Sequence, residues 1–137
     1  MERTQLQRIE LADFLVIAER TLDIPAETLR LGYCRIDQAL AALAVPFSGF
    51  ADVEVHPRTY QKAAAYCFAI VRYHPFVDGN KRVGWVTMRE FIARNGYTWT
   101  HGRDGPDEAV RAVEALAAGT VPEEHFANWV GHRMHDD

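Results

Sequence analysis

The sequence predicts an all-α domain with one short β-hairpin. Apolar residues recur at helical spacing in several segments, and proline, glycine or Asn-Gly stands at most of their ends. Residues 47–55 differ, because apolar and polar side chains alternate there as in short strands. Of the 137 residues, 48% are hydrophobic, which is enough for a packed core and argues against a disordered chain. We therefore expect a single domain over residues 1–137.

The expected helices share apolar residues spaced three or four apart. The segment that ends at Tyr73 is apolar on most of its circumference, so we expect it to be central and buried. We place the helices from Leu11 to Leu22, Ile36 to Val45, Pro57 to Tyr73, near Asn80 to Asn95, Gly105 to Gly119, and from Thr120 onwards.

Local residues set the ends of these helices. Pro46 stops the second helix, and Pro57 suits the first position of the third, where its missing N–H would be unpaired anyway. Asn95-Gly96 ends the fourth helix. The segment from Thr120 to Glu123 resembles a capping box for the last helix.

A few short segments are expected to be extended. Residues 47–55 predict an exposed hairpin or flap, because Val53 and Val55 alternate with polar residues, and an ordinary connecting loop is an equal alternative. Residues 5–9 and 97–100 are also expected to be briefly extended.

Charge and cysteine content exclude some classes of function. The formal net charge is −4 and the chain has no long Lys/Arg run, so direct binding of nucleic acid is disfavoured. Cys34 and Cys67 are far apart and have no CxxC partner, so neither a zinc site nor a redox pair is indicated. We expect both cysteines to be reduced and in or near the core.

The sequence also argues against a membrane protein. Its N-terminus lacks an apolar signal core, and no apolar run is long enough to span a bilayer. We therefore expect a soluble protein of the cytoplasm.

The most informative segment is residues 74–82, with the sequence His-Pro-Phe-Val-Asp-Gly-Asn-Lys-Arg. It joins the end of one expected helix to the start of the next. A helix N-terminus leaves N–H groups unpaired and carries partial positive charge, so Gly79 and Asn80 would let the backbone approach an anion. Lys81 and Arg82 add formal charge at the same point. The segment therefore predicts a phosphate-binding loop.

Asp78 and His74 add chemistry to this loop. A carboxylate beside phosphate repels it unless a divalent ion lies between, and Mg²⁺ binds one or two carboxylates together with phosphate oxygens. A neutral imidazole at His74 could take a proton from an attacking hydroxyl, which with charge stabilisation is most of what phosphoryl transfer needs. Taken singly, these residues are also typical of a helix end, a turn and a solvated face. The hypothesis depends on their order and compactness.

The pattern His-Pro-Phe-x-Asp-Gly-Asn-Lys-Arg resembles the signature of the Fic/Doc family, particularly its Doc (death-on-curing) toxin branch. Residues 32–40 resemble the early helix of the family, and residues 91–97 resemble the close of the helix after the motif. The resemblance covers roughly Leu29 to Trp129. It implies an all-α, Fic-fold helical bundle with a small β-hairpin flap near the active site, and residues 47–55 lie at the expected place.

The resemblance implies a role for each matching residue. His74 would be the general base that deprotonates a Ser, Thr or Tyr hydroxyl of a target protein. Asp78 would hold Mg²⁺, and the Phe76 ring would anchor the loop in the core. The phosphates of ATP would be bound by Gly79, Asn80, Lys81 and Arg82, of which the last two would also act in catalysis.

Two positions favour one branch of the family and two favour the other. AMP-transferring Fic members have a second glycine in place of Lys81 and commonly an arginine in place of Trp85. The Doc branch shares the lysine and resembles enzymes that move the γ-phosphate of ATP to a protein, with elongation factor Tu as the known target type. Gly79 and Pro75 instead look like ordinary Fic. Phosphoryl transfer is therefore the leading hypothesis, and AMP transfer is the second.

The resemblance also implies partners. Self-inhibiting Fic proteins carry the helical pattern Ser/Thr-x-x-x-Glu-Gly/Asn, and the sequence has no copy of it. Control would then come from a cognate antitoxin whose helical segment covers the active site. The implied protein is the toxin of a type II toxin–antitoxin system that modifies a host protein and blocks translation. A non-catalytic anion-binding or partner-binding domain is the third hypothesis.

Overall fold

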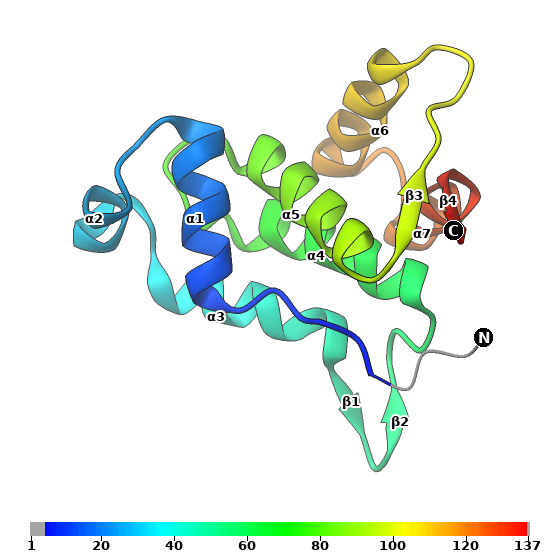
Figure 1. Cartoon of the computed structure of the whole chain (residues 1–137), viewed down its shortest axis with the longest axis horizontal. Coiled ribbons are helices and arrows are strands. Elements are labelled where there is room, and N and C mark those ends of the chain that lie inside the picture. Colours follow the sequence, from blue (N-terminus) through cyan, green and yellow to red (C-terminus); the bar gives the residue numbers. More distant parts are fainter. Residues whose placement is uncertain (1–4, 137) are drawn as a thin grey trace.

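The computed structural model describes residues 5–136, which form a bundle of helices with short antiparallel strand pairs at its edges (Figure 1). The helices are α1 (Leu11–Leu22), α2 (Ala26–Thr28), α3 (Ile36–Ala44), α4 (Thr59–Tyr73), α5 (Asn80–Arg94), α6 (Pro106–Ala118) and α7 (Glu123–Arg133). Single π-helical and 3₁₀ turns cover Leu29–Tyr33 and Val45–Phe47. The strands are β1 (Gly49–Phe50), β2 (Val53–Glu54), β3 (Tyr97–Trp99) and β4 (Met134–Asp136). The predicted all-α fold with a small hairpin is confirmed, and no helix within residues 5–136 is long and apolar enough to cross a membrane.

Helix α4 is the centre of the bundle, as its largely apolar circumference predicts. It packs against α5, α3 and α7 (Figure 1). Residues 63–65 are alanines without exposed surface, so neighbouring helices can approach α4 closely. Cys67 on this helix and Cys34 are buried free thiols. Burial raises the pKa of Cys67 to about 12 and that of Cys34 to about 11, so neither is suited to act as a thiolate nucleophile.

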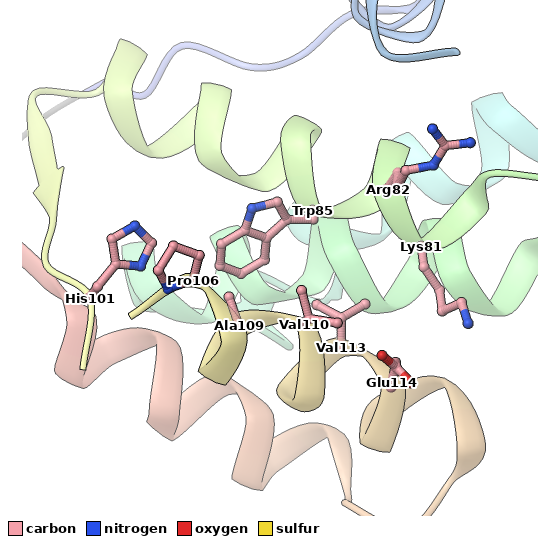
Figure 2. A pocket seen from close by; sticks show the side chains of 9 residues that line it. All are labelled: Lys81, Arg82, Trp85, His101, Pro106, Ala109, Val110, Val113 and Glu114. Atoms are coloured by element: carbon pink, nitrogen blue, oxygen red, sulfur yellow. The ribbon is translucent and has the colours of Figure 1, made fainter. Parts of the chain in front are cut away.

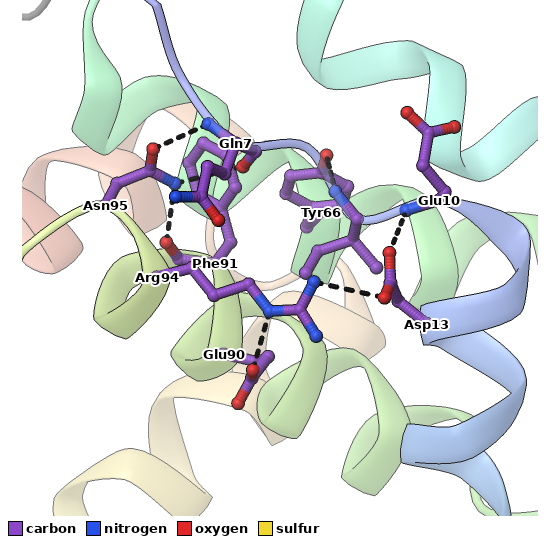
Figure 3. Close-up of polar contacts among 9 residues, drawn as sticks. Gln7, Glu10, Asp13, Tyr66, Glu90, Phe91, Arg94 and Asn95 are labelled. Carbon is purple, nitrogen blue, oxygen red and sulfur yellow. Dashed lines mark hydrogen bonds and ion pairs between the residues drawn. The ribbon is translucent and has the colours of Figure 1, made fainter.

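Polar side chains of the bundle hold the segment before α1 in place (Figure 3). The Gln7 N–H donates to Asn95 Oδ1 at 2.8 Å, and Asn95 Nδ2 donates to the Gln7 carbonyl at 3.0 Å. The Ile9 N–H donates to the Tyr66 hydroxyl at 3.0 Å. Side chains thus satisfy this backbone, and the expected extended piece at residues 5–9 joins no sheet in the described part of the chain.

Strands β1 and β2 form the predicted hairpin, which projects from the helical body (Figure 1). Phe50 pairs with Val53 across a turn made by Ala51 and Asp52. Both turn residues have positive φ, 50° and 67°, as a type I′ turn requires. The side chains of Phe50 and Val53 are largely exposed, so the hairpin adds little to the core. The alternative expectation of an ordinary connecting loop is wrong.

Strand β3 belongs to a second two-stranded sheet, whose strand pairing the sequence does not reveal. The expected extended segment at residues 97–100 is observed as β3, and it pairs antiparallel with β4 near the C-terminus, with Thr98 opposite His135. Strands of three residues are too short to show alternation. Strand β4 follows α7 in the chain, so it comes close to β3 only when α7 packs on the bundle.

Two expectations about helix starts are wrong. Helix α4 begins at Thr59, so Pro57 lies before the N-cap residue rather than at the first helical position. Residues 32–40 are not one helix, because Gly32 has a φ of 144° and α3 begins only at Ile36. A φ in this range favours glycine, so the chain turns there instead of continuing a helix.

The expected capping box of the last helix is also absent. Helix α7 has Pro122 at its N-cap and no side-chain capping bond. The Thr120 hydroxyl instead donates to the Ala115 carbonyl at 3.1 Å. Thr120 therefore closes α6, whose last carbonyls lack partners within the helix, rather than opening α7.

Phe76 anchors the segment between α4 and α5 in the core, as predicted. Its side chain has no exposed surface. The ring stacks on Phe14 of α1 with centroids 5.5 Å apart and an interplanar angle of 24°, and it lies 6.5 Å from the Tyr33 ring. The loop is thus held by the same core that packs the helices.

We expect Phe76→Ala to lower the free energy of unfolding by about 3–5 kcal/mol, because it removes a fully buried ring and leaves a cavity. Chemical denaturation followed by circular dichroism measures the change. Val77→Ala is the control, because the Val77 side chain is 74% exposed and its loss should cost no more than about 0.5 kcal/mol. Equal effects of the two substitutions would contradict the anchoring role of Phe76.

Candidate active site

His74 is the C-cap residue that follows helix α4, and its backbone is left-handed with φ 55° and ψ 57°. This conformation costs a non-glycine residue on the order of 1–2 kcal/mol, so neighbouring groups must maintain it. The His74 N–H donates to the Ile70 carbonyl at 3.0 Å, and the Arg35 guanidinium donates to the His74 carbonyl. The imidazole is exposed, and so accessible to a second molecule.

The residues before α3 run antiparallel to the loop and hold it. The Arg35 N–H donates to the Pro75 carbonyl at 2.7 Å, and Cys34 forms a β-bridge with Phe76. Arg35 therefore contacts the loop through both its main chain and its side chain. Sequence reasoning missed this residue, because an isolated arginine 39 positions before His74 gives no local signal.

Asn80 fixes the shape of the loop from inside. Its side chain is buried, with 5% of the residue exposed. Asn80 Oδ1 accepts from the Phe76 N–H at 2.9 Å, and Nδ2 donates to the Phe76 carbonyl at 2.9 Å. The carboxamide therefore holds the loop itself, and the backbone N–H of Asn80, at the start of α5, is a donor for an anion.

Gly79 and Asp78 form the turn into α5. Gly79 is the N-cap with φ 89° and ψ 9°, and an added Cβ would also meet Leu22 Cδ2 at 2.3 Å. The Gly79 N–H donates to Asp78 Oδ1 at 2.8 Å, which places the carboxylate at the helix N-terminus, where partial positive charge stabilises it. The first N–H groups of α5 have no partner within the helix, so they are donors for an anion.

A cavity of about 290 Å³ lies at this end of α5. Val71 of α4 and Ala117 of α6 form its sides. The structure brings every site residue predicted from the sequence to this cavity, namely His74, Asp78, Gly79, Asn80, Lys81 and Arg82.

Lys81 and Arg82 give the cavity free positive charge. Both side chains are exposed. In the described part of the chain, neither forms an ion pair or a side-chain hydrogen bond. Two unneutralised cations beside a helix N-terminus make the cavity suited to a polyanion such as a chain of phosphates.

The cavity fits a magnesium ion that arrives with phosphate better than a resident metal centre. Asp78 is the carboxylate in its lining. Among residues 5–136, no group of three or more His, Cys, Asp or Glu side chains is placed to hold a metal. Mg²⁺ does not require such a group, since it commonly binds one or two carboxylates, waters and substrate phosphate oxygens.

Comparison with known proteins gives the family. The Fic/DOC family model matches residues 4–92, which is more than half of the chain, and the chain belongs to this family. The matched range includes α1 and the whole loop from His74 to Arg82, and it ends within α5. Helices α6 and α7 lie beyond it. The family expected from the loop sequence is therefore confirmed.

The chain is also similar to a protein whose name places it in the Doc branch of this family. Over 56 residues, the chain is 41% identical to a protein called Toxin Doc from Mycolicibacterium smegmatis. The alignment covers 41% of this chain and 43% of that protein, so the similarity spans less than half of the relative's length.

We expect Asn80→Ala to lower the free energy of unfolding by about 1–3 kcal/mol, because it leaves the buried N–H and carbonyl of Phe76 without partners. Thermal and chemical denaturation measure the change. Arg82→Ala is a matched control two residues further along α5, since its side chain has no partner among the described residues and a cation near a helix N-terminus is not favoured. A loss below about 0.5 kcal/mol for Asn80→Ala would show that the loop does not depend on these bonds.

Proposed function

We propose that the chain is the toxin of a toxin–antitoxin system and transfers the γ-phosphate of ATP to a hydroxyl group of a host protein. One observation carries the proposal: a single cavity gathers an exposed imidazole, a carboxylate, two free cations and the N-terminus of α5. These are the parts that phosphoryl transfer needs, since its catalysis is mostly positioning and charge stabilisation.

In this mechanism, His74 takes the proton from a Ser, Thr or Tyr hydroxyl of the target as the oxygen attacks the γ-phosphorus. The new bond forms between that oxygen and phosphorus, and the bond to the β-phosphate oxygen breaks, so ADP leaves. The left-handed backbone of His74, held by Arg35, fixes where the imidazole stands relative to α5.

The negative charge of the phosphates is met by this chain's own groups. The N–H groups that open α5 donate to phosphate oxygens, and the side chains of Lys81 and Arg82 add formal charge. Asp78 would hold a magnesium ion bound to the nucleotide, and such an ion neutralises charge that develops on the transferring phosphate. Asn80 contributes through its backbone, because its side chain holds the loop.

Partners follow from the same proposal. The similarity to a protein named Toxin Doc supports the proposal that this chain has a cognate antitoxin. Because the sequence contains no internal inhibitory motif, we propose that a helical segment of the antitoxin covers the cavity. The target is a protein of the host cytoplasm, with elongation factor Tu as the first candidate, so that its modification blocks translation. We propose that one domain carries this activity.

AMP transfer by the same base and loop is the second candidate. Gly79 and Pro75 favour it, since both match the AMP-transferring pattern. Lys81 and Trp85 favour γ-phosphate transfer, because each replaces a residue that this pattern uses around the triphosphate. The indole of Trp85 is uncharged, so it cannot supply the missing cation, and it packs against Trp99 and Trp129 with ring centroids 5.2 Å and 6.2 Å away.

We expect the γ-label of ATP, and not the α-label, to appear on a protein when the purified chain is incubated with cell extract. His74→Ala should lower the transfer rate by roughly two to four orders of magnitude, as expected for loss of a general base. His132→Ala, at an exposed histidine on α7, is the control and should keep the wild-type rate.

Transfer of the α-label alone would replace the kinase proposal with AMP transfer. The non-catalytic alternative is tested by expression in cells. Growth arrest that persists unchanged with His74→Ala would favour a binding domain, whereas its disappearance would favour an enzyme.

We expect Asp78→Asn to raise the Mg²⁺ concentration for half-maximal transfer by roughly tenfold or more, since even outer-sphere partners of a metal contribute 10–100-fold. A magnesium titration of the transfer rate measures this. Asp37→Asn, at an exposed carboxylate on α3, should leave the titration unchanged. An Asp78→Asn titration that matches wild type would exclude Asp78 as a metal ligand.

A further inference from the structure

Besides the cavity at the start of α5, helix α6 borders a second and a third cavity, which face different helices. The second, of about 300 Å³, lies against α5, and Figure 2 shows Trp85 of α5 and Val110 of α6 on opposite sides of it. The third, of about 470 Å³, lies against the last turns of α4 and the start of α7. Lys81 and Arg82 line the second cavity but not the third. The third cavity is therefore separate from the cationic side of the site.

The third cavity adjoins the first one beside His74. Val71 of α4 and Ala117 of α6 line both cavities. Along α4, the third cavity is lined by Phe68, Val71 and Arg72, which share one face of the helix because they stand three or four residues apart. This face leads towards His74, the C-cap residue of α4. A polypeptide that lies in the third cavity can thus reach the imidazole.

The lining of the third cavity combines apolar side chains with an ion pair. Phe68 and Leu116 are buried and Val121 is half-buried, so they form an apolar base. Arg72 of α4 pairs with Glu123 of α7, and 64% of the arginine side chain is exposed. An exposed pair of this kind contributes little to stability, so both side chains can turn towards a ligand at low cost. An apolar base with polar edges is typical of a surface that binds protein.

The main chain beside this cavity favours an extended ligand. Pro122, which precedes α7, is itself extended with φ −63° and ψ 154°. The Val121 N–H has no hydrogen-bond partner in the described part of the chain. An extended peptide that lies beside these residues can offer a main-chain carbonyl to that N–H, as an added strand does.

The proposed reaction fixes the side from which the acceptor hydroxyl arrives. In phosphoryl transfer, the attacking and leaving oxygens lie roughly in line through the phosphorus. The phosphates are drawn to the start of α5 and to Lys81 and Arg82, so the hydroxyl approaches from the opposite side, past His74. The third cavity lies on that side, because it adjoins the first through Val71 and has no lining residue on α5.

We propose that the third cavity docks an extended segment of the acceptor protein, with its hydroxyl at His74 and an apolar side chain about three residues away against Phe68. This inference rests on the proposed function and adds the place where its protein substrate binds. His74 stands six positions after Phe68, which corresponds to a rise of about 9 Å along a helix. An extended chain covers about 3.3 Å per residue, so about three residues span this distance.

The test uses synthetic peptides with a central threonine, an alanine background and one leucine at each nearby position in turn. Mass spectrometry measures how fast wild type modifies each peptide with ATP, and it detects added phosphate and added AMP alike. Val121→Trp would fill the third cavity, and Val121→Ala would enlarge it. Val16→Trp is the matched control, at an exposed valine of α1 that lines none of the three cavities.

We expect wild type to modify the peptide with leucine about three residues from the threonine roughly tenfold or more faster than the peptide without leucine, because the leucine buries apolar surface. Val121→Trp should abolish this preference, and Val121→Ala should shift it from leucine to phenylalanine. Val16→Trp should keep it. Calorimetry should show ATP affinities within about twofold of wild type for all three variants, since none of the substituted residues lines the first cavity.

An absent leucine preference, or one that survives Val121→Trp in a folded variant, would overturn the docking site. Thermal unfolding checks the fold, and should Val121→Trp not fold, an unchanged preference of Val121→Ala overturns the inference equally. A wild-type chain that modifies a protein in cell extract but none of the peptides would also overturn it, and the proposed function would stand. A chain that neither binds ATP nor modifies any protein would overturn both together.

Discussion

The site depends on one buried interaction, the pair of hydrogen bonds between the Asn80 carboxamide and the backbone of Phe76. These bonds close the loop between α4 and α5, and the Phe76 ring stacked on Phe14 ties the closed loop to the core. Because buried polar groups without partners are costly, the loop has little freedom to rearrange while these bonds persist. The position of His74 at the end of α4 relative to the start of α5 is therefore set by core packing.

Around this fixed loop, charge and apolar surface are separated in space. Free cations and unpaired helix N–H groups lie at the start of α5, and an apolar groove continues along α5 against α6. Lys81 belongs to both regions, so it links them. Lys81 and Trp85 are the two positions at which the chain departs from the AMP-transferring Fic pattern. Lys81 adds charge at the proposed phosphate site, and Trp85 lines the apolar groove beside it.

The sequence predicted most of the helices and the hairpin, because helical periodicity and turn residues are local signals. It also predicted the members of the cavity formed by the loop, since they lie within nine consecutive residues from His74 to Arg82. It missed Arg35 and Ala117, which reach the same place from distant segments. The sequence also did not predict strand β4, its pairing with β3, or the capping of α7. A few residues carry little pattern, and several arrangements satisfy the same backbone groups.

By itself, the sequence determined most of the helices, the hairpin, and which residues can take part in catalysis or anion binding. Residue spacing and composition are enough to predict these features. Tertiary structure alone decided how those residues are used. It turned the Asn80 side chain inward, bound the His74 carbonyl to Arg35, and set α6 beside Trp85 to form a second cavity. The reason is physical: each of these contacts joins segments that approach one another only when the helices bury their apolar faces together.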